Sequence, residues 1–263
     1  MFHGLTAQIP TQVFTADQVL SNYVCVFYAA FLLSFVATPA MRIVALHFGI
    51  IDRPDQLRKL HGKPIAYLGG VAVFVGWLFG LFISQFLALH RLEVGWPVDV
   101  NNVAHPIIPL SIVMGALIIV ILGLCDDTWG LPPGIKIGGQ VFAALFLLYD
   151  GIGVDSAGQI LGPIILRIVP FIHGGAPFES GPVLNWFIYV ASCILVIAVV
   201  VGCCNASNLM DGLDGLCSGV TAIIALGFLI VATHLAMVGG GINTNLDAVR
   251  VIVAMALLGA VLG

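Results

Sequence analysis

Long runs of apolar residues, separated by polar connections, are the dominant pattern along the chain. A helix needs about 20 mainly apolar residues to cross the hydrocarbon core of a bilayer. Such runs predict about seven transmembrane helices, of which the fourth is short. We expect these helices at residues 21–46, 67–89, 107–125, 136–150, 185–202, 218–238 and 248–263. The pattern therefore predicts an all-α polytopic membrane protein with a single transmembrane domain over residues 1–263.

The composition supports this assignment because charged residues are scarce. They make up 8% of the chain and hydrophobic residues make up 60%, whereas soluble domains carry about 25% charged residues. So few charges cannot cover a water-facing surface, and we expect lipid to cover most of it. The chain also lacks a basic stripe, which argues against nucleic-acid binding.

The segment between the fourth and fifth predicted helices, residues 151–184, has a mixed pattern. Its QILGPIILRIVPFIHGG stretch fits either a short β-hairpin or a re-entrant piece. Glycines elsewhere have a simpler interpretation. Gly69 and Gly70, and the GxxxG pair Gly76 and Gly80, indicate close helix packing rather than phosphate binding.

The basic residues predict which side of the membrane each connection faces. Residues 47–67 form the densest basic segment, with Arg53, Arg58, Lys59 and Lys63. By the positive-inside rule this connection faces the cytoplasm, so we expect the N-terminus outside. Connections after the other odd-numbered helices then face the cytoplasm too.

Acidic residues gather in those cytoplasmic connections. Asp126 and Asp127 end the third predicted helix, and Asp211 and Asp214 follow the fifth. Two adjacent carboxylates repel each other and are costly to keep ionised near hydrocarbon. A magnesium ion, which takes oxygen ligands, removes both costs. The alternative is a solvated helix end, where an aspartate pair is ordinary.

The second acidic segment, NASNLMDGLDG, has a regular spacing. Asn205, Asn208, Asp211 and Asp214 recur every third residue. On a helix this spacing keeps neighbouring members on adjacent faces. A polar loop is the alternative, but turn formation does not require four polar residues at a fixed interval. The segment is therefore a candidate functional site.

Basic residues near these acids are candidates for phosphate binding. Arg58, Lys59 and His61 lie in the RKLHGK segment, and Lys136 begins the fourth predicted helix. Arginine binds phosphate oxygens in a bidentate manner. The alternatives are a cluster that only orients the first helix and a terminal lysine that extends to the membrane interface.

Three segments together resemble the polyprenyl-phosphate N-acetylhexosamine-1-phosphate transferases of glycosyltransferase family 4. That family includes the undecaprenyl-phosphate GlcNAc-1-phosphate transferase and the phospho-MurNAc-pentapeptide translocase. The segments are DRPDQLRKLHGKPIAYLGG (52–70), GLCDDTWGLPPGIKIGGQ (123–140) and NASNLMDGLDGLCSG (205–219). The RK-x-H form of the first segment looks closer to the GlcNAc-1-phosphate branch.

The resemblance implies a role for each matching residue. It implies catalytic roles for Asp126, Asp127, Asp211 and Asp214, and metal binding by the first three. It implies substrate binding by the basic and amide residues, which are Arg58, Lys59, His61, Lys136, Asn205 and Asn208. The expected cofactor is Mg²⁺, with Mn²⁺ as an alternative.

The implied activity is transfer of an N-acetylhexosamine-1-phosphate, expected to be GlcNAc-1-phosphate, from its UDP form to undecaprenyl phosphate, with release of UMP. The expected partners are the polyprenyl phosphate lipid, UDP-N-acetylhexosamine and the bilayer, with a homodimer left open. Such a step initiates cell-envelope polysaccharide synthesis, as for lipopolysaccharide, which predicts a bacterial inner-membrane protein with its active site on the cytoplasmic face. Phospho-MurNAc-pentapeptide transfer and membrane transport are alternatives.

Family members continue into a later cytoplasmic motif with a further metal-binding aspartate. The present sequence stops at Gly263, so we expect it to lack its C-terminal helices and last cytoplasmic motifs. An inactive truncated remnant is therefore another alternative.

Overall fold

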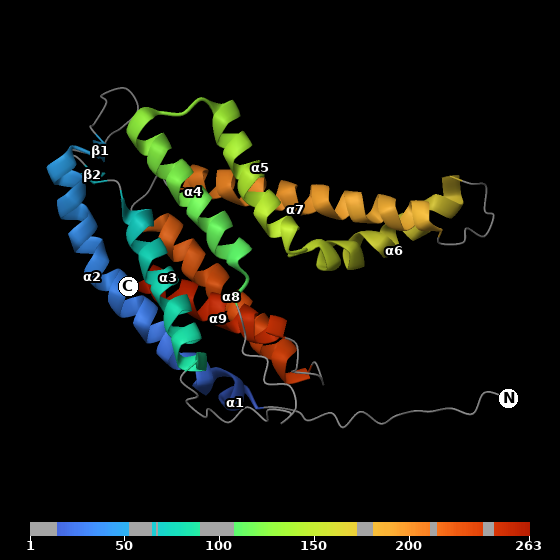
Figure 1. The fold of residues 1–263 in the computed structure, drawn as a ribbon, viewed down its shortest axis with the longest axis horizontal. Helices are drawn as coiled ribbons and strands as arrows, with labels where there is room; N and C mark the ends of the chain where they lie inside the picture. Colours follow the sequence, from blue (N-terminus) through green and yellow to red (C-terminus); the bar gives the residue numbers. More distant parts are fainter. Residues whose placement is uncertain are drawn as a thin grey trace. The chain divides into compact units, whose positions relative to one another are not determined.

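The computed structural model describes residues 15–52, 65–66, 68–89, 108–172, 181–210, 215–238 and 245–263. These residues are almost entirely helical, as the apolar pattern predicts (Figure 1). The elements are α1 (Ala16–Leu20), the 3₁₀ turn η1 (Ser21–Tyr23), α2 (Val24–Phe48), β1 (Ile51–Asp52), β2 (Ile65–Ala66), α3 (Gly69–Leu89), α4 (Leu110–Trp129), α5 (Pro133–Tyr149), α6 (Val154–Ile172), α7 (Pro182–Met210), α8 (Leu216–Val238) and α9 (Asn245–Leu262).

Each of the seven predicted spans coincides with one of the helices α2 to α5 and α7 to α9. Within the described ranges, α2, α3, α4, α7 and α8 are long and apolar enough to cross a membrane, and α5 with α6 would make a sixth crossing as one broken span. The chain is therefore a multi-pass membrane protein. Seven crossings, and the side that each connection faces, stay predictions.

The helices form two compact units, one within residues 1–108 and 214–263 and the other within residues 109–213. In the first unit, α9 contacts α2, α3 and α8. Its Val251, Ile252 and Ala256 are fully buried. Small and branched apolar side chains thus form the centre of this unit.

The packing role predicted for the GxxxG pair is confirmed. A Cβ atom on Gly76 would lie 2.7 Å from the nearest atom of α2, and one on Gly80 would lie 3.0 Å away. Carbon atoms do not normally approach so closely, so α3 reaches α2 because both positions lack a side chain. No described atom lies within 4 Å of the equivalent position at Gly69 or Gly70, and the packing role predicted for these two is not seen.

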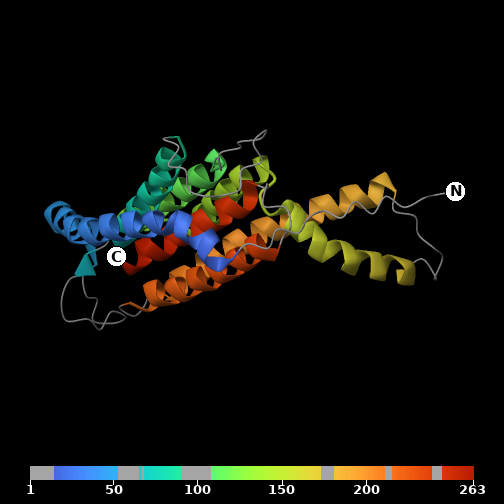
Figure 2. The ribbon, with the colours of Figure 1, turned by 90° about the horizontal axis from the view of Figure 1, so that it is seen from below.

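In the second unit, α5 contacts both α4 and α7, and α6 contacts α7. Figures 1 and 2 show α6 running back along the N-terminal half of α7. Small residues again allow close approach, since a Cβ atom on Gly115 of α4 would lie 3.3 Å from the carbonyl oxygen of Ala143 on α5. The helices of this unit thus pack through α5, which contacts two of them, and through the pair of α6 and α7.

The β-hairpin predicted as one form of residues 151–184 is wrong, because residues 154–172 form the helix α6. Val154 and Ala157 are buried at helical spacing, and Gly158 lies against Ser192 of α7. A partner helix therefore favours helix over strand here. The alternative of a re-entrant piece stays open, because α5 and α6 meet at 91°.

Candidate functional site

The polar residues of the second unit gather where α4 ends and α5 begins. Gly130 follows α4 with φ +65°, a left-handed conformation that suits glycine, and its N–H donates to the carbonyl oxygen of Asp126 over 2.8 Å. Pro133 takes the first helical position of α5, where a proline sacrifices no helical hydrogen bond. The tight turn brings the last turn of α4 beside the first turn of α5.

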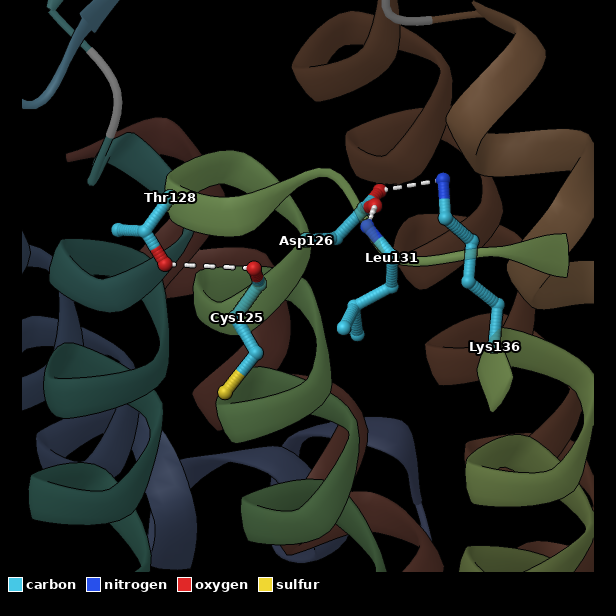
Figure 3. A network of polar contacts seen from close by, with 5 residues as sticks. All are labelled: Cys125, Asp126, Thr128, Leu131 and Lys136. Atoms are coloured by element: carbon cyan, nitrogen blue, oxygen red, sulfur yellow. Dashed lines mark hydrogen bonds and ion pairs between the residues drawn. The ribbon is translucent and has the colours of Figure 1, made fainter.

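Asp126 is the centre of this turn (Figure 3). Its Oδ1 accepts a hydrogen bond from the backbone N–H of Leu131 over 3.0 Å, and its Oδ2 pairs with Nζ of Lys136 at 2.7 Å. The side chains of Asp126 and Lys136 are 21% and 31% exposed. The ion pair is thus half-buried and fixed by the backbone at one end.

Both charges lie at helix ends that disfavour them. A carboxylate is unfavourable near a helix C-terminus and an ammonium group near an N-terminus, because of the helix dipole. Asp126 lies in the last turn of α4 and Lys136 in the first turn of α5. Each charge neutralises the other, but helix stability alone does not account for placing them there. Local rules broken in this way are typical of functional positions.

The helix α4 is longer than predicted, so both aspartates of the pair lie on it. Asp127 is exposed in the last turn. Successive helical residues are rotated by about 100°, so Asp127 projects from α4 in a different direction from Asp126. The adjacent carboxylates therefore have different surroundings, which the sequence alone does not distinguish.

The helix α7 is also longer than predicted, so Asn205 and Asn208 lie on a helix rather than after one. Asn205 is half-buried, and its Nδ2 donates to Oε1 of Gln140 on α5 over 2.9 Å and to the carbonyl oxygen of Val201 over 2.8 Å. Asn208 lies near the end of α7 and is exposed. The structure therefore brings Asn205 to α5 at Gln140, one helical turn after Lys136.

Sequence analysis did not predict Gln140. It is buried, with 7% of its surface exposed, although it is polar. Its sequence signal is the spacing from Lys136, because residues four apart share one helix face. One face of α5 thus presents Lys136 to α4 and Gln140 to α7.

The remaining predicted site residues lie outside the described residues. They are Arg58, Lys59, His61, Asp211 and Asp214. For the first three the structure describes only the base of their segment, where Ile51 pairs with Ala66 and Asp52 with Ile65 in an antiparallel ladder. The convergence of all three motifs stays a prediction.

The donor set of the described site fits a hard cation only in part. In the described part of the chain, no group of three or more acidic, histidine or cysteine residues is placed to hold a metal ion. The two carboxylate oxygens of Asp126 already contact Leu131 and Lys136. Metal binding by Asp126, Asp127 and Asp211 stays a prediction, and Asp211 lies outside the described residues.

A family model described as glycosyl transferase family 4 matches residues 109–263. This match covers more than half of the chain. The chain belongs to glycosyl transferase family 4. The family assignment predicted from the three sequence segments is confirmed.

Relatives within the family have related names. The probable undecaprenyl-phosphate N-acetylglucosaminyl 1-phosphate transferase of Bacillus subtilis is 29% identical over 79% of this chain and 47% of its own length. The decaprenyl-phosphate N-acetylglucosaminephosphotransferase of Mycolicibacterium smegmatis is 31% identical over 89% of this chain and 50% of its own length. A phospho-N-acetylmuramoyl-pentapeptide-transferase of Desulforudis audaxviator is 30% identical over 77% of this chain and 58% of its own length. The chain thus spans about half the length of these family members.

Proposed function

We propose that the protein transfers GlcNAc-1-phosphate, or a close N-acetylhexosamine relative, from its UDP derivative to undecaprenyl phosphate and releases UMP. The observation that carries the proposal is the half-buried Asp126–Lys136 ion pair, fixed at the polar end of a membrane unit in a glycosyl transferase family 4 chain. The names of the Bacillus subtilis and Mycolicibacterium smegmatis relatives support both the sugar phosphate and the polyprenyl acceptor.

In this reaction a phosphate oxygen of the lipid attacks the phosphorus that bears the sugar. A new phosphorus–oxygen bond forms, and the bond from that phosphorus to the UMP oxygen breaks. The second pKa of a phosphate monoester is about 6, so the acceptor is already largely a dianion at neutral pH. The enzyme therefore needs to orient the groups and neutralise their charge more than to remove a proton.

The described residues suit these two tasks. Lys136 would neutralise phosphate oxygens, and Asp126 would hold the ammonium group of Lys136 in place. Asn205 and Asn208 would contact the nucleotide-sugar through their amides. Asp127 and Asp211 would hold a magnesium ion, with Asp214 as a further acidic group. When bound, the ion would supply positive charge to the diphosphate.

The basic segment would complete the site. Arg58, Lys59 and His61 would contact phosphate oxygens from the connection between α2 and α3. The proposal also keeps the predicted orientation, with this polar surface on the cytoplasmic face of the bacterial inner membrane. Lipid phosphate and a cytoplasmic nucleotide-sugar meet at that surface, so it is the place where the reaction has access to both.

Phospho-MurNAc-pentapeptide transfer is the second candidate. The Desulforudis audaxviator relative favours it, because its identity of 30% is similar to that of the other two. The reacting groups are the same in both reactions, and only the sugar substituents differ. Parallel assays with UDP-GlcNAc and with the UDP-MurNAc-pentapeptide distinguish the two candidates.

The test uses the complete natural protein in membranes, with labelled UDP-GlcNAc and undecaprenyl phosphate. Asp127→Asn and Asp211→Asn should each lower transfer by at least about a hundredfold, because each removes a charge that acts on the transition state. Asp155→Asn, which changes an exposed aspartate of α6, is the matched control and should keep the wild-type rate. Chelation should stop transfer, and added magnesium should restore it.

Membrane levels of all variants should be equal. Wild-type rates for Asp127→Asn and Asp211→Asn would remove the site assignment. Absence of transfer by the unmutated protein with either nucleotide-sugar would remove the proposed function.

A further inference from the structure

We propose that Gln140 is a positioning residue, which orients the side-chain amide of Asn205 so that its oxygen faces the substrate as an acceptor. This inference rests on the proposed function, because it assigns Asn205 to the nucleotide-sugar. It concerns a residue on α5 that touches α7 and lies one helical turn after Lys136.

The orientation of Asn205 follows from one backbone group. The carbonyl oxygen of Val201 only accepts hydrogen bonds, so the Asn205 atom that lies 2.8 Å from it must be Nδ2. The Gln140 atom that lies 2.9 Å from the same Nδ2 must then be an acceptor, which is Oε1. Both hydrogens of the Asn205 amide are thereby occupied.

What remains of Asn205 is its Oδ1 atom, which has no hydrogen-bond partner in the described part of the chain. An amide oxygen fixed in this way accepts from a hydroxyl or an N–H group of a ligand. Without Gln140, one of the two amide hydrogens would lose its acceptor, and only the bond to the carbonyl oxygen of Val201 would hold the group. The hydrogen bond to Gln140 therefore reinforces the orientation that leaves Oδ1 available to a ligand.

Burial makes the loss of this hydrogen bond costly. Gln140 is 7% exposed, so water reaches it poorly, and a buried amide without a partner is costly. The same face of α5 holds Lys136 against Asp126. One helix thus fixes both the cation proposed for the phosphates and the amide proposed for the nucleotide-sugar, and a shift of Asn205 changes its alignment with Lys136.

The test is a double-mutant cycle on the complete natural protein, with transfer from UDP-GlcNAc as the readout. Gln140→Met keeps the side-chain length and removes the acceptor, and Asn205→Ala removes the oriented amide. Each single change should lower kcat/KM by about tenfold to a hundredfold, as for other residues that orient a binding group. In the Asn205→Ala background, Gln140→Met should have no further effect.

Two controls separate positioning from folding. Gln159→Met changes an exposed glutamine of α6 in the same unit and should be silent. Gln140→Asn keeps a polar amide but withdraws its oxygen by one methylene. If the buried methionine of Gln140→Met prevents folding, Gln140→Asn replaces it in the test and should also lower kcat/KM. Both variants should accumulate in membranes as the unmutated protein does.

The outcomes are distinguishable. If the unmutated protein is active and both Gln140→Met and Gln140→Asn keep its kcat/KM, Gln140 has no positioning role. Additive losses in the cycle also overturn it, because Gln140 would then act independently of Asn205. An inactive unmutated protein instead removes the proposed function on which the inference rests.

Discussion

Replacing Lys136 by methionine should destabilise the second unit and abolish transfer for two separable reasons. The change keeps the length and apolar stem of the side chain but removes the ammonium group that lies 2.7 Å from Oδ2 of Asp126. Asp126 would keep the hydrogen bond from Leu131. It would become a half-buried carboxylate at a helix C-terminus with no countercharge from Lys136.

The magnitude follows from the burial of the pair. Exposed ion pairs contribute about 0.2–1 kcal/mol, and removing one partner of a fully buried pair costs about 3–5 kcal/mol. With side chains 31% and 21% exposed, this pair lies between the two cases. We expect Lys136→Met to cost about 1–3 kcal/mol.

The double variant Asp126→Asn, Lys136→Met separates the two effects. The Asp126→Asn change keeps a side-chain oxygen that accepts from the N–H of Leu131, and no unpaired charge remains. Most of the lost stability should therefore return. Transfer should stay at least about a hundredfold below the wild-type rate, because the cation proposed for the phosphate oxygens is still absent.

The assay combines thermal unfolding in detergent with transfer from UDP-GlcNAc. For a chain of this length, 1 kcal/mol shifts Tm by about 2–4 °C, so a loss of about 2–12 °C is expected for Lys136→Met. Arg167→Met, which removes an exposed cation of α6, is the matched control. A double variant with wild-type activity would show that Lys136 has no role beyond the ion pair. An unchanged Tm for Lys136→Met would show that the pair does not stabilise the unit.

Two further predictions concern glycines. Gly76→Leu should lower Tm, because its side chain would meet α2, and overpacking costs about 1–3 kcal/mol; Gly227→Leu on α8, which has no described neighbour within 4 Å, should not. Gly130→Ala should cost about 1–2 kcal/mol because of its φ of +65°, whereas Gly134→Ala, with φ outside the left-handed region and no close neighbour, should be tolerated. Thermal unfolding checks both pairs, and equal Tm values within a pair would refute the corresponding argument.

The membrane helices could be predicted from the sequence because the signal is strong. Long apolar runs occur at most of the predicted spans, and hydrocarbon leaves the backbone little choice except helix. The ends of the helices were less predictable. The helices α4 and α7 continue to Trp129 and Met210, since polar residues such as Asp126 and Asn205 stay helical when a neighbouring helix binds their side chains.

The helix α6 could not be predicted from its pattern alone. Pro163 and Pro170 both lie within it, and these residues normally argue against a continuous helix. Packing against α7 supplies the compensation, as the contact of Gly158 with Ser192 illustrates. The choice depends on a partner that is distant in sequence, and local propensity does not include such a partner.

The candidate site divides in the same way. The residue types at Asp126, Lys136 and Asn205 predicted a functional site, because charged and amide side chains are costly at the ends of apolar helices unless they have a role. Gln140 gave a weaker signal, since a single glutamine in a helix of 17 residues is compatible with many surroundings. Its importance follows from its position four residues after Lys136, which becomes meaningful only when α4 and α7 are both known to contact α5.

This register also accounts for how the second unit combines apolar packing with a defined polar end. Small residues such as Gly115 and Ala143 let α4 and α5 approach, but contacts of this kind tolerate sliding along the helix. The ion pair between Lys136 and Asp126 and the hydrogen bond from Asn205 to Gln140 do not tolerate sliding, because each joins specific atoms less than 3 Å apart. Two polar links on adjacent turns of α5 therefore fix the axial positions of both neighbouring helices. A site that must hold a phosphate group and a nucleotide-sugar in line needs that axial precision, which apolar surfaces alone do not provide.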